Sequence, residues 1–175
     1  LPAGDPFCLD LDTAHDAGDQ RRVGIEYRAL PEQVIVDDIL LLDDGKLRLR
    51  VDDVTERAVD CTVIIGGRLS SRKGVNKLGG GLAAPALTEK DRSDIAGMAT
   101  VDPDFVAVSF VSSSDDIKLA RTLLDEVGVS PAIIAKIERA EVVADYELLD
   151  SIIVTAEGVM VARGDLGVEV GDAQL

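Results

Sequence analysis

Aromatic residues, cysteine and histidine are scarce in this 175-residue chain. It has no tryptophan, and aromatic residues make up only 3% of it, whereas 46% of its residues are apolar. We therefore expect a core built from Val, Ile, Leu and Ala. Two cysteines, Cys8 and Cys61, exclude a disulfide framework. The single histidine, His15, lies in a polar stretch rich in Asp and Gly, so we expect it in a solvent loop rather than as a catalytic base.

Long hydrophobic runs and a signal segment are also missing. No apolar run approaches the ~20 residues that a membrane-spanning helix needs. No charged-then-apolar segment opens the chain. We therefore expect a reduced, cytoplasmic location and no membrane partner. Because the chain starts with Leu1 and stops just after an expected helix start, we also expect it to be a piece of a longer protein.

Positive charge is outnumbered, with 18 Lys and Arg against 33 Asp and Glu and a formal net charge of −15. This balance argues against nucleic acid as a partner, because such binding depends on neutralising phosphates with cations. A well-solvated acidic surface is one explanation. Because Asp outnumbers Glu and Arg outnumbers Lys, a high-salt cytoplasm is the other. Molar salt shortens the Debye length to ~3 Å and screens the repulsion between surface charges.

Residues 1–82 show the pattern of a small all-β domain. Short β-branched segments at 39–42, 47–51 and 59–65 are separated by acidic turns, and Asp44–Gly45 is a favoured pair for a tight hairpin. Several short strands at this spacing predict a small β-barrel or a sandwich.

Beyond the glycines at 79–81 the pattern becomes that of alternating strands and helices. Strands are predicted at 104–110, 132–137 and 158–162, and helices start at Thr88, cover 114–127 and cover 140–149. Continuous apolar strands that alternate with amphipathic helices indicate parallel pairing. About three such units predict part of a larger barrel over residues 83–175, and an open sheet stays an alternative from the pattern alone.

Two of these strand ends carry groups suited to phosphate chemistry. Lys136 and Glu138 lie two residues apart and therefore project to one face of a strand. Gly164 and Asp165 follow the next strand. A lysine, two carboxylates and a glycine turn can hold a phosphorylated acid on a hard metal ion. The structural alternatives are a plain Lys136–Glu138 ion pair and a helix cap at Asp165.

Six segments resemble, in order, the hallmark motifs of the pyruvate kinase family. They lie at residues 41–45, 72–76, 84–91, 108–111, 134–138 and 160–169. The resemblance covers nearly the whole chain, and six ordered matches are far more specific than one. It implies an α/β fold with an all-β insert, in which residues 1–82 are a small β-barrel lid domain. Residues 83–175 would be the middle of a (β/α)8 TIM barrel.

The resemblance also implies a reaction, the transfer of a phosphoryl group from phosphoenolpyruvate to ADP in glycolysis, giving pyruvate and ATP. Glu138 and Asp165 match the carboxylates that hold Mg²⁺, and Lys136 matches the catalytic lysine that stabilises the transferring group. Gly164 and Asp165 would join Lys136 in binding the substrate, through backbone N–H groups that face its carboxylate. Lys73 matches a lid lysine that reaches the nucleotide phosphates.

Other parts of the family site would fall outside this chain. These are the ligands of K⁺, a substrate-binding arginine and a threonine beside the substrate. We therefore expect the 175 residues alone to be inactive, and the parent protein to be a homotetramer. Within the chain, Arg163 is a candidate to orient Glu138.

Two other functions stay open. A magnesium-dependent carbon–carbon lyase of the phosphoenolpyruvate/pyruvate barrel type would account for the metal site, but not for the inserted β-domain or the Lys73 loop. A non-catalytic nucleotide- or metabolite-binding fragment is the second alternative. Intact Lys136, Glu138 and Asp165 argue against it, because a protein that no longer catalyses is free to lose such residues.

Overall fold

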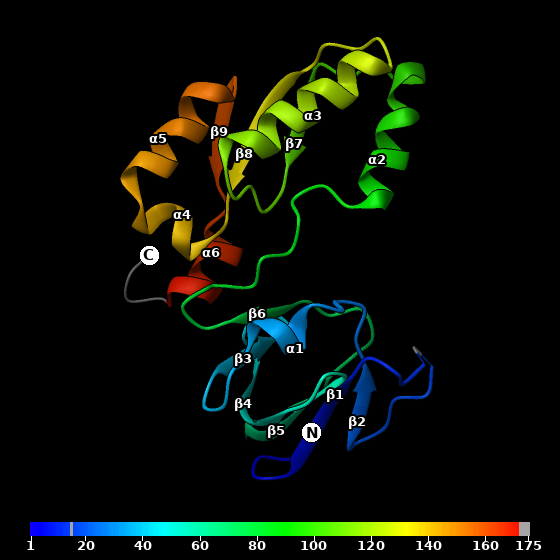
Figure 1. The fold of residues 1–175 in the computed structure, drawn as a ribbon, viewed down its shortest axis with the longest axis vertical. Coiled ribbons are helices and arrows are strands. Elements are labelled where there is room, and N and C mark those ends of the chain that lie inside the picture. Colours follow the sequence, from blue (N-terminus) through cyan, green and yellow to red (C-terminus); the bar gives the residue numbers. More distant parts are fainter. Residues whose placement is uncertain (15, 172–175) are drawn as a thin grey trace. The chain divides into compact units, whose positions relative to one another are not determined.

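The computed structural model describes residues 1–14 and 16–171, which form two compact units (Figure 1). The first unit comprises residues 1–84 with 168–171, and the second comprises residues 85–167. The solvent-loop prediction for His15 lies outside the described residues. Among the helices of the described part, none is both long and apolar enough to cross a membrane.

The first unit is built on a sheet of six strands within the described residues, in the order β2-β1-β5-β4-β3-β6. Its elements are β1 (Pro6–Asp10), β2 (Arg22–Gly24), α1 (Leu30–Gln33), β3 (Ile39–Leu42), β4 (Leu47–Val54), β5 (Ala58–Ile65) and β6 (Val75–Lys77). Neighbouring strands are antiparallel except β1 and β2, which are parallel. The predicted strands at 39–42, 47–51 and 59–65 are confirmed, and β4 runs three residues further than predicted.

Alternation of side chains along β4 explains how this sheet buries one face. Leu47, Leu49 and Val51 are buried, whereas Arg48 and Arg50 between them are exposed. The core is aliphatic apart from Phe7 and Cys61, as the composition predicts. Its buried members are Phe7, Leu9, Leu30, Val34, Leu40, Leu42, Leu47, Leu49, Val51, Val59, Cys61 and Val63.

Both cysteines are free and buried in this unit. Phe7 is paired with Cys61 across β1 and β5, and Cys8 is paired with Asp60. Since directly paired residues share a face and successive residues alternate, Cys8 and Cys61 project to opposite faces of the sheet. Burial raises the pKa of the Cys61 thiol to about 12, so this side chain serves as a small apolar group.

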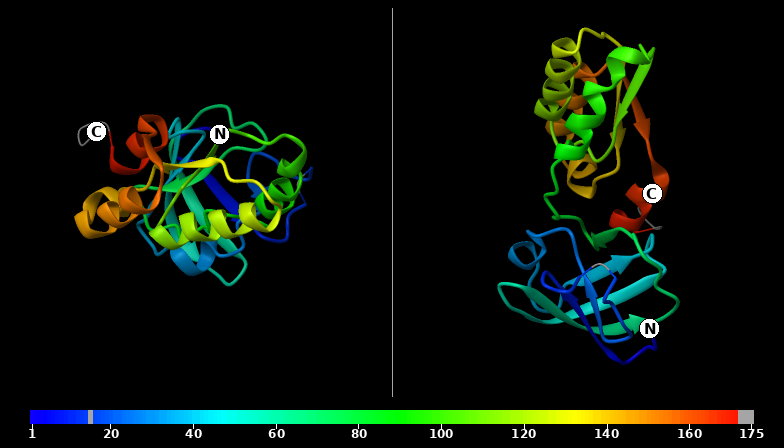
Figure 2. Two further views of the ribbon diagram at one scale, coloured as in Figure 1. Left: turned by 90° about the horizontal axis from the view of Figure 1, so that it is seen from above. Right: turned by 90° about the vertical axis from the view of Figure 1, so that its right-hand side faces the viewer.

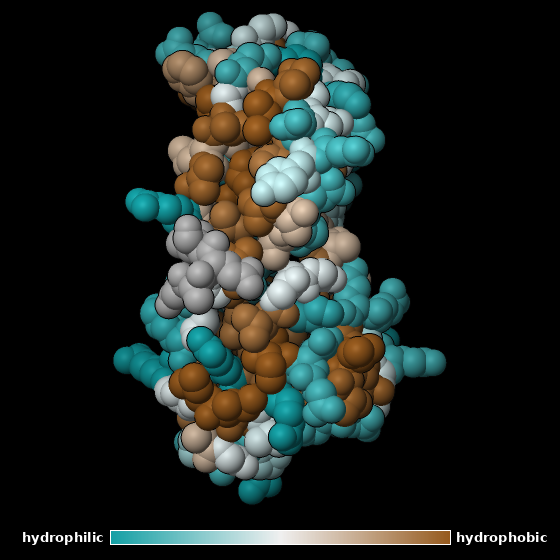
Figure 3. Space-filling model, turned by 90° about the vertical axis from the view of Figure 1, so that its left-hand side faces the viewer, coloured by the Kyte–Doolittle hydropathy of each residue, from teal (hydrophilic) through white to brown (hydrophobic). Residues whose placement is uncertain are grey.

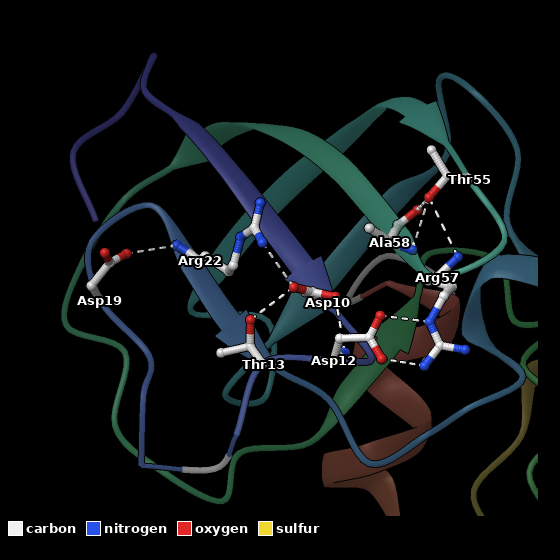
Figure 4. Close-up of polar contacts among 8 residues, drawn as sticks. All are labelled: Asp10, Asp12, Thr13, Asp19, Arg22, Thr55, Arg57 and Ala58. Atoms are coloured by element: carbon white, nitrogen blue, oxygen red, sulfur yellow. Dashed lines mark hydrogen bonds and ion pairs between the residues drawn. The ribbon is translucent and has the colours of Figure 1, made fainter.

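A polar network fixes the end of β1 (Figure 4). The carboxylate of Asp10 accepts hydrogen bonds from the Asp12 backbone N–H at 3.0 Å, from the Thr13 hydroxyl at 2.8 Å and from Arg22 Nη1 at 3.0 Å. Arg57 in turn forms a two-pronged ion pair with the carboxylate of Asp12. The N–H of Asp12, the hydroxyl of Thr13 and the charge of Arg22 hold the pKa of Asp10 below its usual range.

We expect Asp10→Asn to weaken this end of the sheet at pH 7 and to have less effect in acid. A depressed pKa means that the Asp10 carboxylate stabilises the fold above its unfolded pKa, and that this contribution disappears as pH falls through the folded pKa. Hydrogen exchange of the β1 amides should show about fivefold lower protection at pH 7, the equivalent of ~1 kcal/mol, because asparagine keeps an acceptor oxygen and the loss is that of about one ordinary hydrogen bond. The exposed Asp16→Asn is the control. An effect of Asp10→Asn that is equally large at pH 3 would contradict this prediction.

The second unit has a parallel sheet whose order within the described residues is β7-β8-β9. Its elements are α2 (Glu89–Ala96), a 3₁₀ turn (Met98–Thr100), β7 (Phe105–Val108), α3 (Ser114–Glu126), β8 (Ala132–Ile137), α4 (Ala140–Ala144), α5 (Tyr146–Thr155), β9 (Gly158–Val161) and α6 (Arg163–Val170), the last of which continues past residue 167. The predicted parallel pairing is confirmed. Helices α3 and α5 lie on one face of the sheet (Figure 2).

Two predicted boundaries are wrong in this unit. The helix expected at 140–149 is two helices, because the Asp145 side chain accepts hydrogen bonds from the backbone N–H groups of Glu147 and Leu148 and so caps a new helix. The strand expected at 104–110 ends at Val108, since Phe110 has a φ of +53° and cannot continue a strand. The predicted cap at Thr88 is confirmed as a capping box with Asp91.

An apolar surface covers α5 and β9 of the second unit (Figure 3). Its exposed members are Ile153, Val154, Val159, Met160 and Val161. Within the described residues β9 pairs only with β8, so its other edge presents unpaired backbone groups beside these side chains. The strand is short, with four residues, but the apolar side chains beside its free edge form a contiguous exposed patch of the kind that often marks an interaction surface.

Candidate active site

The end of β8 places Lys136 and Glu138 together, as their spacing predicts. Ile133, Ala135 and Ile137 of β8 are buried, whereas Lys136 is half-buried on the other face. Glu138, directly after the strand, projects to the same side as Lys136. Lys136 Nζ lies 2.5 Å from Glu138 Oε1. The two side chains therefore form a close ion pair at the carboxyl end of the strand.

Glu138 is a fully buried carboxylate whose two oxygens have different partners. Its side chain is 0% exposed, and Oε2 accepts a hydrogen bond from the Phe110 backbone N–H at 2.6 Å. Among the described residues, Oε1 has the ion pair with Lys136 and no geometrically acceptable hydrogen bond. Burying a charge is costly unless it is paired or coordinates a metal. Oε1 is thus suited to coordinate a metal cation.

Ser109 and Phe110 follow the neighbouring strand β7, and each contacts one member of the Lys136–Glu138 pair. Lys136 Nζ donates to Ser109 Oγ at 3.1 Å. The φ of +53° at Phe110 is uncommon for a large side chain and aims its N–H at Glu138. Sequence analysis recognised residues 108–111 as a motif but assigned them no role.

Arg139 is the functional candidate that sequence analysis missed. Its side chain is 5% exposed, and Nε donates to the Phe110 carbonyl oxygen at 2.7 Å. Nη1 donates to Glu141 Oε1 at 3.3 Å. Arg163, the arginine expected to orient Glu138, is exposed. One signal for Arg139 was available in the sequence. It is a charged residue directly after Glu138 at the end of an apolar strand, where a side chain is expected to be buried.

Gly164 and Asp165 lie in the first turn of α6, directly after β9. Lys136 is in register with Met160, and Ile137 with Val161, so the ends of β8 and β9 are adjacent. The N–H groups of a first helical turn have no partner within the helix and attract anions. A Cβ added at Gly164 would meet no atom within 4 Å, so this turn is open. Asp165 is half-buried.

The donor set at these strand ends fits Mg²⁺. The described residues contain no group of three or more His, Cys, Asp or Glu that could hold a metal ion by itself. Mg²⁺ does not need one, because it is usually bound by one or two carboxylates and completed by water and substrate oxygens. Glu138, whose Oε1 already faces a cation in Lys136, and Asp165, at the next strand end, supply carboxylates of the preferred kind.

Lys73 belongs to the first unit, in the loop before β6. Its Nζ lies 2.7 Å from Asp43 Oδ1, and Lys46 Nζ lies 3.4 Å from Asp43 Oδ2. Lys73 first, and then Lys46, hold the pKa of the buried Asp43 carboxyl below its usual range. Asp43, Asp44 and Gly45 all have positive φ, which turns the β3–β4 loop so that Asp43 meets both lysines. The structure thus pairs Lys73 with a carboxylate that sequence analysis did not single out.

Comparison with known proteins identifies the family. The profile described as the pyruvate kinase barrel domain matches residues 1–175. Curated pyruvate kinases of Buchnera aphidicola (subspecies Schizaphis graminum) and Haemophilus influenzae are 51% and 50% identical over 175 residues, covering all of this chain and 36% and 37% of theirs. Pyruvate kinase II of Salmonella typhimurium is 50% identical over the same length, covering 36% of that protein. The chain spans little more than a third of the length of these relatives. The resemblance found in the six motifs is confirmed, and the chain belongs to the pyruvate kinase family.

Proposed function

We propose that the protein transfers the phosphoryl group of phosphoenolpyruvate to ADP, giving pyruvate and ATP, as a Mg²⁺-dependent cytoplasmic enzyme of glycolysis. The observation that carries this proposal is the 2.5 Å pair of Lys136 and the fully buried Glu138 at a parallel strand end. It lies within a chain about half identical to named pyruvate kinases along its whole length.

The proposal gives each residue of the site a stated role, and Asp165 has two. Glu138 and Asp165 would hold Mg²⁺, which when bound offsets the negative charge of the phosphoryl oxygens. Lys136 is a fixed cation directed at the charge that develops on the transferring group. Its contacts to Glu138 and Ser109 keep the ammonium group in place before the substrate binds. The N–H groups of Gly164 and Asp165 would hold the substrate carboxylate.

Lys73 would bind the nucleotide phosphates. Its ion pair with Asp43 keeps the lysine charged and holds it at the edge of the β3–β4 loop. Asp43 raises the pKa of Lys73 above its usual range, so the ammonium form persists at every physiological pH. A phosphate oxygen would then replace Asp43 or share the lysine with it.

We further propose that residues 1–82 are a β-barrel lid and residues 83–175 part of a (β/α)8 TIM barrel. The division of the chain into units between residues 84 and 85 supports the boundary between lid and barrel, although residues 168–171 group with the first unit. The parallel order of β7, β8 and β9 supports the barrel part. A K⁺ site outside this chain and a homotetrameric parent protein belong to the same proposal. The lyase and the non-catalytic fragment are less well supported, because the relatives named above are pyruvate kinases.

The test is a coupled assay of the full-length gene product for ATP formation from phosphoenolpyruvate and ADP, with and without Mg²⁺, at low and at molar KCl. Mg²⁺-dependent ATP formation is the expected result. Activity that rises toward molar salt would support the high-salt explanation of the −15 charge. Cleavage of a carbon–carbon bond in phosphorylated or 2-oxo acids without ATP formation would favour the lyase instead.

The 175 residues taken alone should give no measurable turnover, since they cover 36–37% of their relatives and leave the apolar edge of β9 uncovered. The same coupled assay on the isolated chain, beside the full-length product at equal concentration, checks this. Pyruvate formation by the isolated chain would show that every group needed for the reaction lies within it.

A further inference from the structure

We propose that Arg139 is a positioning residue that fixes the metal-binding carboxylate of Glu138 through the backbone of Phe110. The inference rests on the proposed function insofar as Glu138 holds the metal. Arg139 itself would touch neither metal nor substrate.

The contacts form a continuous chain from one side chain to the other. Arg139 Nε donates to the carbonyl oxygen of Phe110 at 2.7 Å, and the N–H of Phe110 donates to Glu138 Oε2 at 2.6 Å. The two backbone groups of one residue are thus both bound, one by the arginine and one by the carboxylate. These groups belong to the two peptide planes that meet at the Cα of Phe110, so a bond to each restricts both φ and ψ of this residue. Loss of the Arg139 bond frees one of the two planes and thereby loosens the turn that presents the N–H to Glu138.

The conformation of Phe110 explains why such a clamp is needed. Its φ of +53° lies in the left-handed region, which large side chains avoid. Phe110 is also partly exposed, so packing alone does not enforce this conformation. A strained residue persists only where its surroundings hold it. Arg139 is one of those restraints, because its buried guanidinium binds the carbonyl that the left-handed turn presents.

The guanidinium is itself held in place. Nη1 of Arg139 donates to Oε1 of Glu141, in the first turn of α4. The side chain of Arg139 is 5% exposed and that of Glu138 is 0% exposed, so neither is free to swing into solvent. Outer-shell partners of this kind commonly account for 10- to 100-fold in metal affinity.

Arg121 provides a matched control at the opposite end of β8. Its Nη1 donates to the Pro131 carbonyl oxygen at 2.8 Å, and its Nη2 pairs with Glu157 Oε1 at 2.8 Å. It therefore makes the same two kinds of contact as Arg139, one to a carbonyl and one to a glutamate, but at the end of the strand away from Glu138. Loss of either arginine removes a bond to a backbone carbonyl and a bond to a glutamate. Arg121 is the more exposed of the two (29% against 5%), and only Arg139 is connected to the site.

The experiment measures Mn²⁺ binding to the full-length gene product by electron paramagnetic resonance, in the absence of substrates. Arg139→Gln should weaken Mn²⁺ binding by about 10- to 100-fold, whereas Arg121→Gln should change it less than twofold. Arg139→Lys keeps a donor for the Phe110 carbonyl and should recover part of the loss. In the kinase assay, Arg139→Gln should raise the Mg²⁺ concentration needed for half-maximal activity and leave KM for ADP unchanged.

A folded Arg139→Gln that binds Mn²⁺ as the wild type does would overturn the proposal, as would a wild type that binds no Mn²⁺. If Arg139→Gln fails to fold, Glu141→Gln replaces it in the test. This substitution weakens the contact of Arg139 Nη1 with residue 141 and leaves the arginine side chain in place. Mn²⁺ binding weaker in Glu141→Gln than in the wild type would then support the proposal, and unchanged binding would overturn it. A third outcome separates the two proposals. If the wild type binds Mn²⁺ but shows no kinase activity, and Arg139→Gln binds Mn²⁺ more weakly than the wild type, the positioning role stands and only the proposed function is refuted.

Discussion

Lys136→Met should lower kcat for phosphoryl transfer by about 100- to 1,000-fold, the usual cost of removing one charged group that stabilises a transition state. The ammonium group sits 2.5 Å from Glu138 and 3.1 Å from Ser109, so it is fixed before the substrate arrives. Methionine fills a similar volume without the charge. The measurement is the coupled assay at saturating Mg²⁺ and substrates.

Metal binding should separate this effect from loss of the site. Removing Lys136 leaves the buried Glu138 without its counter-ion, and a divalent cation can take that place. We therefore expect Lys136→Met to bind Mn²⁺ at least as tightly as the wild type while its kcat collapses. Lys118→Met is the control, since Lys118 makes an exposed ion pair with Asp115 at 2.7 Å. A Lys136→Met enzyme that keeps more than a tenth of wild-type kcat would mean that the lysine serves Glu138 and not the reaction.

Periodicity predicts most of the fold because it reports which face of each element is buried. The alternation in β4 and the apolar run of β8 locate both strands, and Thr88 marks its helix start. The break at Asp145 was missed even though its signal is local. An Asp followed by helix-forming residues is a cap, but Val142 and Leu149, seven residues apart on either side of it, keep an apolar spacing that a single helix also satisfies.

The Lys136–Glu138 pair could be predicted because period two is enough to place both side chains on one face. The contacts of Ser109, Phe110 and Arg139 could not, since they join residues 27 to 29 positions apart across two strands. The left-handed conformation of Phe110 is also invisible to periodicity, because a motif does not reveal a φ angle. Only adjacent strand ends bring these groups within hydrogen-bond distance.

Glu138→Gln should raise the Mg²⁺ concentration required for activity by at least about 100-fold, because a direct carboxylate ligand contributes more than the outer-shell groups whose loss commonly costs 10- to 100-fold. Glutamine has nearly the same shape, and its amide oxygen can still accept the N–H of Phe110. What the substitution removes is the negative charge that holds Lys136 and the cation. Mn²⁺ binding without substrates and activity titrated with Mg²⁺ measure the two consequences.

Glu157→Gln is the control for losing a carboxylate that accepts a backbone N–H and pairs with a cation away from the site. Glu157 Oε2 accepts the N–H of Ile133 at 2.6 Å and Oε1 pairs with Arg121 at 2.8 Å, so this glutamate repeats the backbone and cation contacts of Glu138 at the other end of β8. Both variants lose a charge that accepts a backbone N–H and faces a cation. The Glu138 side chain is 0% exposed and that of Glu157 is 49% exposed, so Glu138→Gln should lose more stability, and the Mg²⁺ requirement is the quantity that separates the two. If the two also shifted the Mg²⁺ requirement equally, Glu138 would be a structural residue, and the carboxylate that holds the metal would have to be sought elsewhere, beginning with Asp165.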